Sequence, residues 1–180
     1  MNKTVKNMLL VIGEHLLFVV LSFFLVSTFL QLLRHHLYIL SIITGVFYIS
    51  STYSAGWSLS KKDYAAAKEA ARIADDESLL SLYKRYNGFI IALPNLVISV
   101  ALFFAGLSGN ITWYFIYELY NYSFLYAMLD ASKNLIVPLA VLFAVLPYFA
   151  YGVGYVMGKN KKVLFIKYLP KILYKNPNKD

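Results

Sequence analysis

Few side chains in this sequence could take part in chemistry, and the most suggestive of them lie inside long apolar runs. Glu14 and His15 interrupt the first run, and Asn95 lies in the third. We expect them to share one polar layer with Tyr53 and Tyr151. A carboxylate, an imidazole and an amide in an apolar setting could hold a cation, a proton or a polar ligand. A structural hydrogen-bond network, or a Glu14 that reaches the membrane interface, is the alternative, and the sequence leaves both open.

The residue patterns of common enzymes are missing. The sequence contains no H-E-x-x-H, no G-x-S-x-G and no pair of aspartates within its apolar runs. It also contains no cysteine, which excludes disulfides, thiolate metal sites and cysteine nucleophiles. We therefore predict a protein that is not an enzyme and that holds no cofactor and no metal.

Membrane-crossing helices are the elements that must position the polar groups. Of the 180 residues, 59% are hydrophobic and 14% are charged, whereas a soluble domain has about 25% charged residues. A helix needs about 20 mainly apolar residues to cross the hydrocarbon. Four runs are long enough: residues 8–33, 37–60, 88–108 and 134–158. The sequence therefore predicts an all-α polytopic membrane protein with four transmembrane helices arranged as two hairpins.

The distribution of lysine and arginine predicts the orientation. Of the 17 such residues, 15 lie before the first run, in residues 61–87 or after Gly158, and only Arg34 and Lys133 lie elsewhere. Short loops rich in Lys and Arg stay on the cytoplasmic side. We therefore place the N-terminus, the loop 61–87 and the C-terminus in the cytoplasm.

Residues 109–133 form the segment that is hardest to place. Residues 111–129 are long and apolar enough for a fifth crossing, but that crossing would move the basic tail to the other side of the membrane. We expect instead an outer interfacial or re-entrant segment, with its aromatic residues at the level of the lipid headgroups. The residues assigned to this outer interface are Trp113, Tyr114, Tyr117 and Tyr120.

Small residues recur every four positions near the ends of the second and fourth runs. Such stripes let helix backbones approach closely, which is a main source of helix association in lipid. We therefore predict that these two helices pack centrally, within one subunit or between the subunits of a homo-oligomer. Residues 53–61 and 151–159 also share a weak pattern, which either a duplication or shared composition explains. The predicted packing positions are Ser54, Gly56, Ser58, Ala150, Gly154 and Gly158.

The two basic cytoplasmic segments have different compositions. The loop 61–87 is rich in Ala, Lys and Glu and predicts one or two helices, with Asp63 as the first cap and residues 75–77 starting a second stretch. We expect it to lie on the membrane, on neighbouring helices or on a partner, with an apolar side made of Ala66, Ala70, Ile73, Leu80 and Tyr83. The acidic residues 75–77 are either a solvated face or a docking surface for a cytosolic protein.

The tail, residues 159–180, reads as a basic interfacial segment. Lys167, Lys171 and Lys175 fall on one face of a helix, and we predict that they bind the anionic lipids of the inner leaflet. Topology and lipid together account for the net charge of +8, so no nucleic-acid partner is needed.

The order of several short motifs carries a loose resemblance. Lys61-Lys62-Asp63 follows the second run, Leu93-Pro94-Asn95 lies in the third, Gly154-Tyr155-x-x-Gly158-Lys159 closes the fourth, and Tyr174-Lys175 lies in the tail. This order resembles that of small four-span bacterial membrane proteins with no assigned activity. The resemblance implies a multi-pass protein of the bacterial inner (plasma) membrane.

Two functions fit this layout. The first is a non-enzymatic, homo-oligomeric membrane module that acts as an envelope sensor or recruits a cytosolic partner through the loop 61–87, in a bacterial stress or defence system. The second is a small oligomeric ion channel or transporter with a polar site around Glu14. A pore needs polar residues through its whole depth, whereas the first and third runs become almost wholly apolar in their outer halves. We therefore favour the module.

Overall fold

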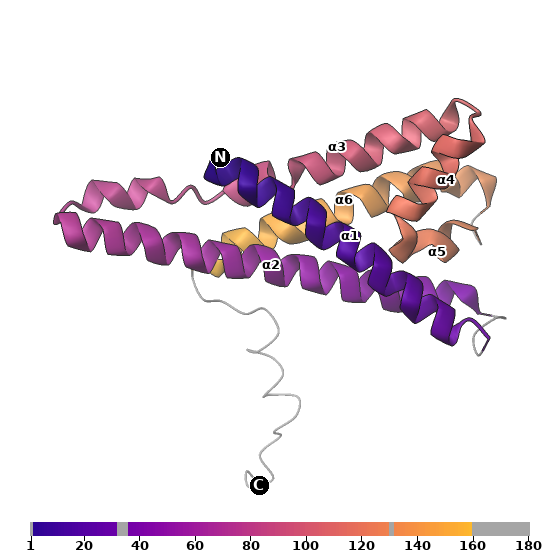
Figure 1. Cartoon of the computed structure of the whole chain (residues 1–180), viewed down its shortest axis with the longest axis horizontal. Helices are drawn as coiled ribbons and strands as arrows, with labels where there is room; N and C mark the ends of the chain where they lie inside the picture. Colours follow the sequence, from indigo (N-terminus) through magenta and orange to yellow (C-terminus); the bar gives the residue numbers. More distant parts are fainter. Residues whose placement is uncertain (1, 32–35, 130–131, 160–180) are drawn as a thin grey trace, which may run out of the picture.

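The computed structural model describes residues 2–31, 36–129 and 132–159, and these residues form a bundle of helices without a strand (Figure 1). Four helices are long and apolar enough to cross a membrane. The prediction of an all-α chain with four such helices is confirmed. In chain order the elements are α1 (Lys3–Phe29), α2 (Leu37–Ala74), the 3-10 helix η1 (Glu77–Leu82), α3 (Asn87–Leu107), α4 (Ile111–Tyr120), the 3-10 helix η2 (Tyr122–Phe124), α5 (Leu125–Leu129) and α6 (Lys133–Gly158).

The helix α1 begins earlier than the predicted span, at Lys3 rather than at residue 8. Asn2 caps it, because the side chain of Asn2 accepts a hydrogen bond from the backbone N–H of Thr4 at 3.0 Å. Asparagine is among the best capping residues.

The tail lysines Lys167, Lys171 and Lys175, which we predicted to bind lipid, lie outside the described residues.

The helix α2 is much longer than the predicted span. Its 38 residues extend about 57 Å at 1.5 Å per residue, nearly twice the ~30 Å of a hydrocarbon core. Our expectation that a new helix begins at Asp63 was wrong, because α2 continues through Asp63 to Ala74. Residues 61–74 are mostly alanine, lysine and other strong helix formers, so nothing in them ends the helix.

The chain turns after α2 at acidic residues, as the sequence predicts. Asp75 adopts the left-handed conformation, with φ of 49°. The side chain of Asp76 then accepts a hydrogen bond from the backbone N–H of Ser78 at 2.9 Å and so caps η1. Hydrogen bonding from the side chain of Ser78, together with this backbone bond, holds the pKa of Asp76 below its ordinary value.

Residues 61–87 form a helical hairpin that folds back onto the bundle. Tyr83 anchors it, because its hydroxyl lies 2.7 Å from Oγ of Ser60 and its ring stacks on that of Tyr155 with centroids 5.8 Å apart. The buried side of α2 in this hairpin consists of Ala67 and Ala71. The hairpin therefore lies on neighbouring helices of the same chain.

The apolar side that we expected for this hairpin was assigned one residue out of phase on α2, whereas Tyr83 is buried as expected. Ala66 is exposed, Ala70 is half-buried, and Ile73 is 77% exposed. Because α2 runs straight through from the span, its rotation is set by the packing of the span and not by a new start at Asp63.

Contacts along the helices define two ends of the bundle. Lys3 of α1 and Tyr155 of α6 both contact Asp63 of α2, whereas Val26 of α1 packs with Leu40 near the start of α2. We call the first the hairpin end and the second the re-entrant end. The helix α1 is therefore antiparallel to α2, and Figure 1 shows the long α2 projecting beyond the other helices with η1 folded alongside.

The helices α2 and α6 run in the same direction with their backbones in contact. A Cβ atom added at Gly56 would meet the carbonyl oxygen of Tyr151, and one added at Gly154 would meet that of Tyr53. Gly158 lies in the same way against the carbonyl oxygen of Trp57. The two segments with similar sequence, 53–61 and 151–159, therefore lie side by side.

The remaining predicted packing positions have other surroundings. Ser54 and Ser58 line a cavity, described below, between α2 and other helices. Ala150 is half-buried. Only the glycines therefore lie where the helix backbones touch, because only glycine leaves room for a neighbouring carbonyl group.

Residues 111–129, here called the re-entrant segment, fold back into the bundle after α3. Gly109 makes the turn with φ of 84°, and α4 then runs alongside α3, with Gly106 against Tyr114. The 10 residues of α4 extend only about 15 Å, too short for a crossing of ~30 Å. The chain reverses after Tyr120, and Figure 1 shows α4 and α5 tucked between the long helices at that end.

Hydrogen bonds attach the re-entrant segment to three of the long helices. The Oγ atoms of Ser22 and Ser123 are 2.8 Å apart, and Thr44 donates to the carbonyl oxygen of Ser123 at 2.6 Å. Ser99 donates to Oδ1 of Asn121 at 3.0 Å. Buried serine and threonine side chains that would otherwise be unpaired are satisfied in this way.

The aromatic residues of this segment are divided between surface and interior. Trp113 is 45% exposed and Tyr114 is 37% exposed, in keeping with an interfacial position. Tyr117 and Tyr120, which we expected at the same interface, are only 1% and 9% exposed. Our assignment of Tyr117 and Tyr120 to the outer interface was therefore wrong. One side of α4 packs against α3 and the rest of the bundle, and these two residues lie on that side.

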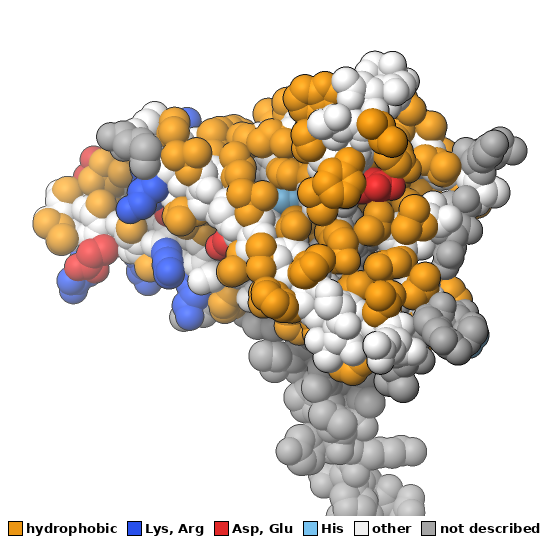
Figure 2. All heavy atoms as spheres, turned by 45° about the vertical axis from the view of Figure 1, so that its right-hand side comes forward, with side chains coloured by type: hydrophobic (Ala, Val, Ile, Leu, Met, Phe, Trp, Pro, Cys, Tyr) orange, Lys and Arg blue, Asp and Glu red, His pale blue; other side chains and the backbone are white. Residues whose placement is uncertain are grey.

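The surface of the molecule is apolar along the long helices and charged mainly at the hairpin end. Figure 2 shows hydrophobic side chains over most of the visible face, and Lys, Arg, Asp and Glu gathered mainly over the end that carries the hairpin. Exposed apolar residues such as Leu17, Val46 and Phe104 are spread along the long helices. Such a surface suits contact with lipid chains over the helices and contact with water at the hairpin end.

Candidate functional site

Four polar side chains from α1, α2, α3 and α4 meet inside the bundle and form what we call the polar cluster. Nδ1 of His15 lies 2.5 Å from the hydroxyl oxygen of Tyr48, and Nε2 lies 2.8 Å from the carbonyl oxygen of Tyr120. The hydroxyl of Tyr120 donates to Oδ1 of Asn95, whose Nδ2 lies 3.5 Å from the Tyr48 hydroxyl. His15, Tyr48, Asn95 and Tyr120 thus make a closed ring of contacts.

The partners of His15 fix its tautomer. A carbonyl oxygen can only accept, so Nε2 must carry the proton that it donates to Tyr120. Nδ1 is then free to accept the proton of the Tyr48 hydroxyl. Both nitrogens of the imidazole are therefore bonded, and the ring holds the tip of the re-entrant segment against α1 and α2.

A cavity of about 290 Å³, here called the central cavity, lies beside the polar cluster. Its walls come from four helices, and its lining is a mixture of hydroxyl, aromatic and small side chains with one carboxylate. The lining residues are Val11, Glu14, His15, Phe18, Tyr48, Ser51, Thr52, Ser54, Ala55, Ser58, Ala92, Asn95, Pro147, Tyr148 and Tyr151. Cavities that hold small ligands usually combine apolar walls with a few convergent polar groups, and this one does so.

Glu14 lies at the exposed edge of α1, where it borders more than one cavity. A second cavity of about 190 Å³ also has Glu14, Ser58 and Tyr151 in its lining, together with Asn7 and Lys62. Among the described residues, no hydrogen bond or ion pair engages the carboxylate of Glu14. A carboxylate in an otherwise apolar helix is costly unless it is paired, solvated or protonated, so its position beside two cavities points to a ligand or to water.

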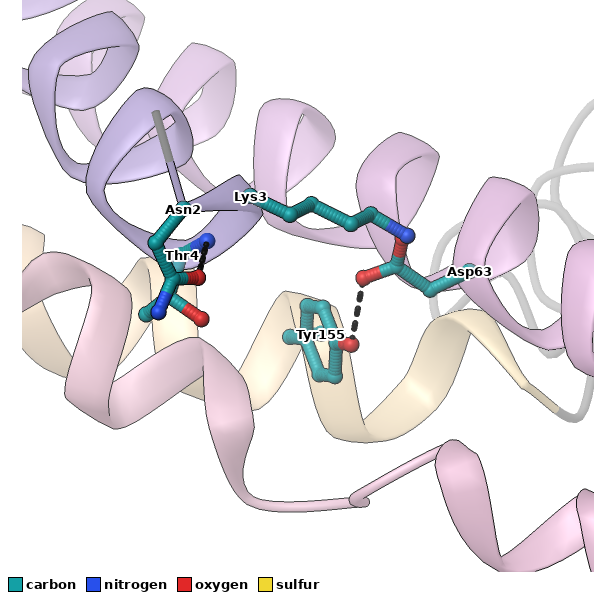
Figure 3. Close-up of polar contacts among 5 residues, drawn as sticks. All are labelled: Asn2, Lys3, Thr4, Asp63 and Tyr155. Carbon is teal, nitrogen blue, oxygen red and sulfur yellow. Dashed lines mark hydrogen bonds and ion pairs between the residues drawn. The ribbon is translucent and has the colours of Figure 1, made fainter.

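An ion pair closes the hairpin end of the space between α1 and α2. Nζ of Lys3 lies 2.7 Å from Oδ1 of Asp63, and the hydroxyl of Tyr155 donates to Oδ2 of the same carboxylate at 2.8 Å. Figure 3 shows Asp63 reaching between Lys3 and Tyr155, with the cap of α1 nearby. A further cavity of about 340 Å³ lies beside these residues and also contacts Asn7 and Lys84.

The three cavities follow one another along α1. Asn7 lines both the hairpin-end cavity and the second cavity, and Glu14 lines both the second and the central one. Together they make a row of cavities, with mixed apolar and polar linings, between the ion pair at the hairpin end and the polar cluster. Beyond the cluster, Tyr117, Phe124 and Phe143 fill the interior, and the rings of the last two stack with centroids 4.4 Å apart.

Most of the residues predicted for the polar layer meet at this place. Glu14, His15, Asn95 and Tyr151 all line the central cavity. Tyr53 does not, because it lies at the contact of α2 with α6. Five residues along a helix turn the side chain by about 140°, which points Tyr53 away from the side on which Tyr48 lies.

Two members of the polar cluster were missed from the sequence. Tyr48 could have been found, because extending the stripe of Thr52, Gly56 and Ser60 by four residues toward the N-terminus reaches it. Tyr120 could not, because its place depends on the reversal of the chain after α4. Its aromatic neighbours suggest a membrane interface, and no local pattern reveals which side of α4 is buried.

The chemistry open to this site is recognition by charge and hydrogen bonding. The central cavity offers a carboxylate, several hydroxyl groups and aromatic rings, and its imidazole is already bonded at both nitrogens. Within residues 2–31, 36–129 and 132–159, no group of three or more His, Cys, Asp or Glu side chains could hold a metal ion. The arrangement therefore favours the binding of a small polar or cationic molecule.

Comparison with known proteins adds no relative to this description of the site. No protein family, no curated protein and no solved structure matches this chain.

Proposed function

We propose that the chain is a multi-pass protein of the bacterial inner membrane, with its N-terminus, the hairpin and the residues after Gly158 on the cytoplasmic side. Two observations support this orientation. Fifteen of the 17 Lys and Arg residues belong to these segments, and contacts with Asp63 bring the start of α1, the hairpin and the end of α6 to one end of the bundle. Positively charged loops remain in the cytoplasm.

Within this topology we propose a non-enzymatic sensor or recruiting module. The observation that carries the proposal is the continuity of α2, which extends from the polar cluster at Tyr48 into the hairpin at Ala74 without a break. A ligand in the central cavity that moves or tilts α2 would move the hairpin with it. Rigid helices that contact a ligand at one point and a partner at another are common elements of such coupling.

The hairpin offers a surface for a cytosolic protein. Ile73 is 77% exposed and Leu82 is 65% exposed, and the acidic residues 75–77 lie in the sequence between them. Apolar side chains rimmed by charge are typical of protein interaction sites. We propose that this surface recruits a soluble partner, that the chain works as a homo-oligomer, and that it serves a bacterial stress or defence response.

A co-purification experiment tests the recruiting function. The full-length protein would be isolated from its native membrane in lipid nanodiscs, and the proteins bound to it would be compared with those bound to the double variant Ile73→Ser and Leu82→Ser. We expect a cytosolic protein that is retained by the parent chain and lost from the double variant, while Lys68→Ala, an exposed change on the same helix, retains it. Identical sets of bound proteins for parent and double variant would contradict the proposal.

The alternative is a small oligomeric channel or transporter with its polar site at Glu14. The path of cavities from the ion pair to Glu14 supports this alternative. The packed aromatic side chains around Tyr117 and Phe124 leave no continuous pore through that part of the bundle, which favours the module. Ion flux into liposomes that carry the parent protein and its loss in Glu14→Gln would favour the transporter over the module.

A further inference from the structure

The central cavity contains two polar groups that no described residue engages. One is the carboxylate of Glu14. The other is the hydroxyl of Tyr151, whose residue is only 3% exposed and makes no hydrogen bond through its hydroxyl to any described residue. Tyr151 lines the same two cavities as Glu14. The exposed side chain of Glu14 and the hydroxyl of Tyr151 are therefore both open to an occupant of the cavity or to water.

The charge that faces this cavity has one sign. Both nitrogens of His15 are bonded to protein groups, Nε2 as a donor to a carbonyl oxygen, so neither is open to an occupant. Lys62 borders only the neighbouring cavity, and no ion pair within the described part of the chain joins it to Glu14. Glu14 is thus the one carboxylate in the lining of the central cavity, with no cation in that lining. An occupant that carries a positive charge fits this balance.

The remaining walls are aromatic. Phe18 comes from α1, Tyr48 from α2, and Tyr148 and Tyr151 from α6, and all four line the central cavity. The face of an aromatic ring carries partial negative charge, so a cation within about 6 Å of the ring centre is attracted by about 0.5 to 2 kcal/mol. Rings from three helices around one carboxylate recognise ammonium ions, including those without an N–H group to donate.

We infer that the central cavity binds a small organic ammonium ion, with Glu14 as its counter-charge and the rings of Phe18, Tyr48, Tyr148 and Tyr151 as its walls. This inference rests on the proposed function only in taking the central cavity as the ligand site. The volume of about 290 Å³ suits a small molecule, because drug-sized ligands occupy cavities of about 300 to 1,000 Å³.

Titration calorimetry on the full-length protein in nanodiscs tests the inference without any variant. Choline is one probe, and 3,3-dimethylbutan-1-ol, which has the same shape with carbon in place of the charged nitrogen, is its neutral control. We expect choline or tetraethylammonium to bind, and the neutral control to bind at least about tenfold more weakly, a difference of about 1.4 kcal/mol. Equal binding of choline and the neutral control, or no binding of either ammonium ion at millimolar concentration, would overturn the inference.

Variants then assign the roles of the residues. We expect Glu14→Gln to weaken ammonium binding at least about tenfold, Tyr151→Leu to weaken it and Tyr151→Phe to preserve most of it, because the ring is kept. Glu69→Gln, which removes an exposed carboxylate on the hairpin, should leave binding unchanged. Unaltered affinity in a folded Glu14→Gln protein would contradict the role of Glu14.

The outcomes also separate this inference from the recruiting function. Ammonium binding by a parent protein that retains no cytosolic partner supports the ligand site and overturns the recruiting function. Partner retention without ammonium binding overturns the ligand class and leaves the recruiting function in place.

Discussion

The two halves of the bundle use polar residues in opposite ways. In the half near the re-entrant end, Ser22, Thr44 and Ser99 all bond to the re-entrant segment, and aromatic rings fill the space between them. In the half near the hairpin end, Glu14 and Tyr151 face cavities and find no partner among the described residues. The first half is filled by packed side chains, whereas the second contains cavities beside its own packed cluster around Ile91 and Tyr155.

The difference follows from what fills the gap between α1 and α2. These two helices barely touch each other along most of their length, so a third element must lie between them. The re-entrant segment supplies that element only as far as the polar cluster, where Tyr120 bonds to His15. Beyond this point cavities lie beside α1 and α2 as far as the ion pair of Lys3 with Asp63 at the hairpin end. The same chain thus seals one half and leaves the other accessible.

The largest expected effect concerns the wall of the open half. Gly154→Leu would force a side chain against the backbone of α2 at Tyr53, and we expect it to destabilise the protein by about 3 kcal/mol or to prevent assembly. Unfolding by SDS in mixed micelles measures the change. The control is Gly13→Ala, where an added Cβ meets nothing within 4 Å, and which should not destabilise the protein because alanine favours a helix more than glycine does. Equal effects of the two changes would refute the close contact of α2 with α6.

The next effect concerns the boundary between the halves. Asn95→Leu leaves the hydroxyl of Tyr120 without its acceptor and removes a contact with Tyr48. A buried polar group that loses its partner costs about 1 to 3 kcal/mol, so we expect a loss of about 2 kcal/mol in the same SDS unfolding assay. A fully stable Asn95→Leu protein would show that the polar cluster does not hold the re-entrant segment.

A pair of serine changes compares the halves directly. Ser123→Ala removes the bond to Ser22, and hydrogen bonds inside membrane proteins contribute on average about 0.6 kcal/mol, with a maximum near 1.7. We expect a loss of about 1 kcal/mol. Ser58→Ala, which lines the cavities, should change the free energy of unfolding by less than about 0.5 kcal/mol. A larger loss of unfolding free energy for Ser58→Ala than for Ser123→Ala would contradict the contrast between the two halves.

The smallest effect concerns the ion pair at the hairpin end. The side chain of Lys3 is 68% exposed and that of Asp63 is 11% exposed. Asp63 keeps its hydrogen bond from Tyr155 when Lys3 is removed, and ion pairs with an exposed partner contribute about 1 kcal/mol or less. We expect Lys3→Ala to lower the unfolding free energy by about 0.5 kcal/mol at low salt and to have less effect at high salt, where charges are screened. A large loss that is independent of salt would mean that Lys3 acts through packing.

The sequence was informative wherever a property depends on helix periodicity or on apolar length. It predicts the four long helices, the acidic turn at residues 75–77 and the meeting of Glu14, His15 and Asn95. It fails at Asp63, where capping propensity competes with a helix that has already been started and simply continues. It also fails at Tyr117 and Tyr120, because an aromatic helix of ten residues has the same composition at an interface and inside a bundle.

Single cysteines test the central claim most directly, because the natural chain contains none. The account predicts that a charged, water-soluble thiol reagent modifies Ser58→Cys in the folded protein, more slowly when an ammonium ligand is present. It predicts that Ser123→Cys stays unmodified until the protein unfolds. Modification of both positions at similar rates, or of Ser123→Cys before Ser58→Cys, would contradict a bundle that is sealed in one half and open in the other.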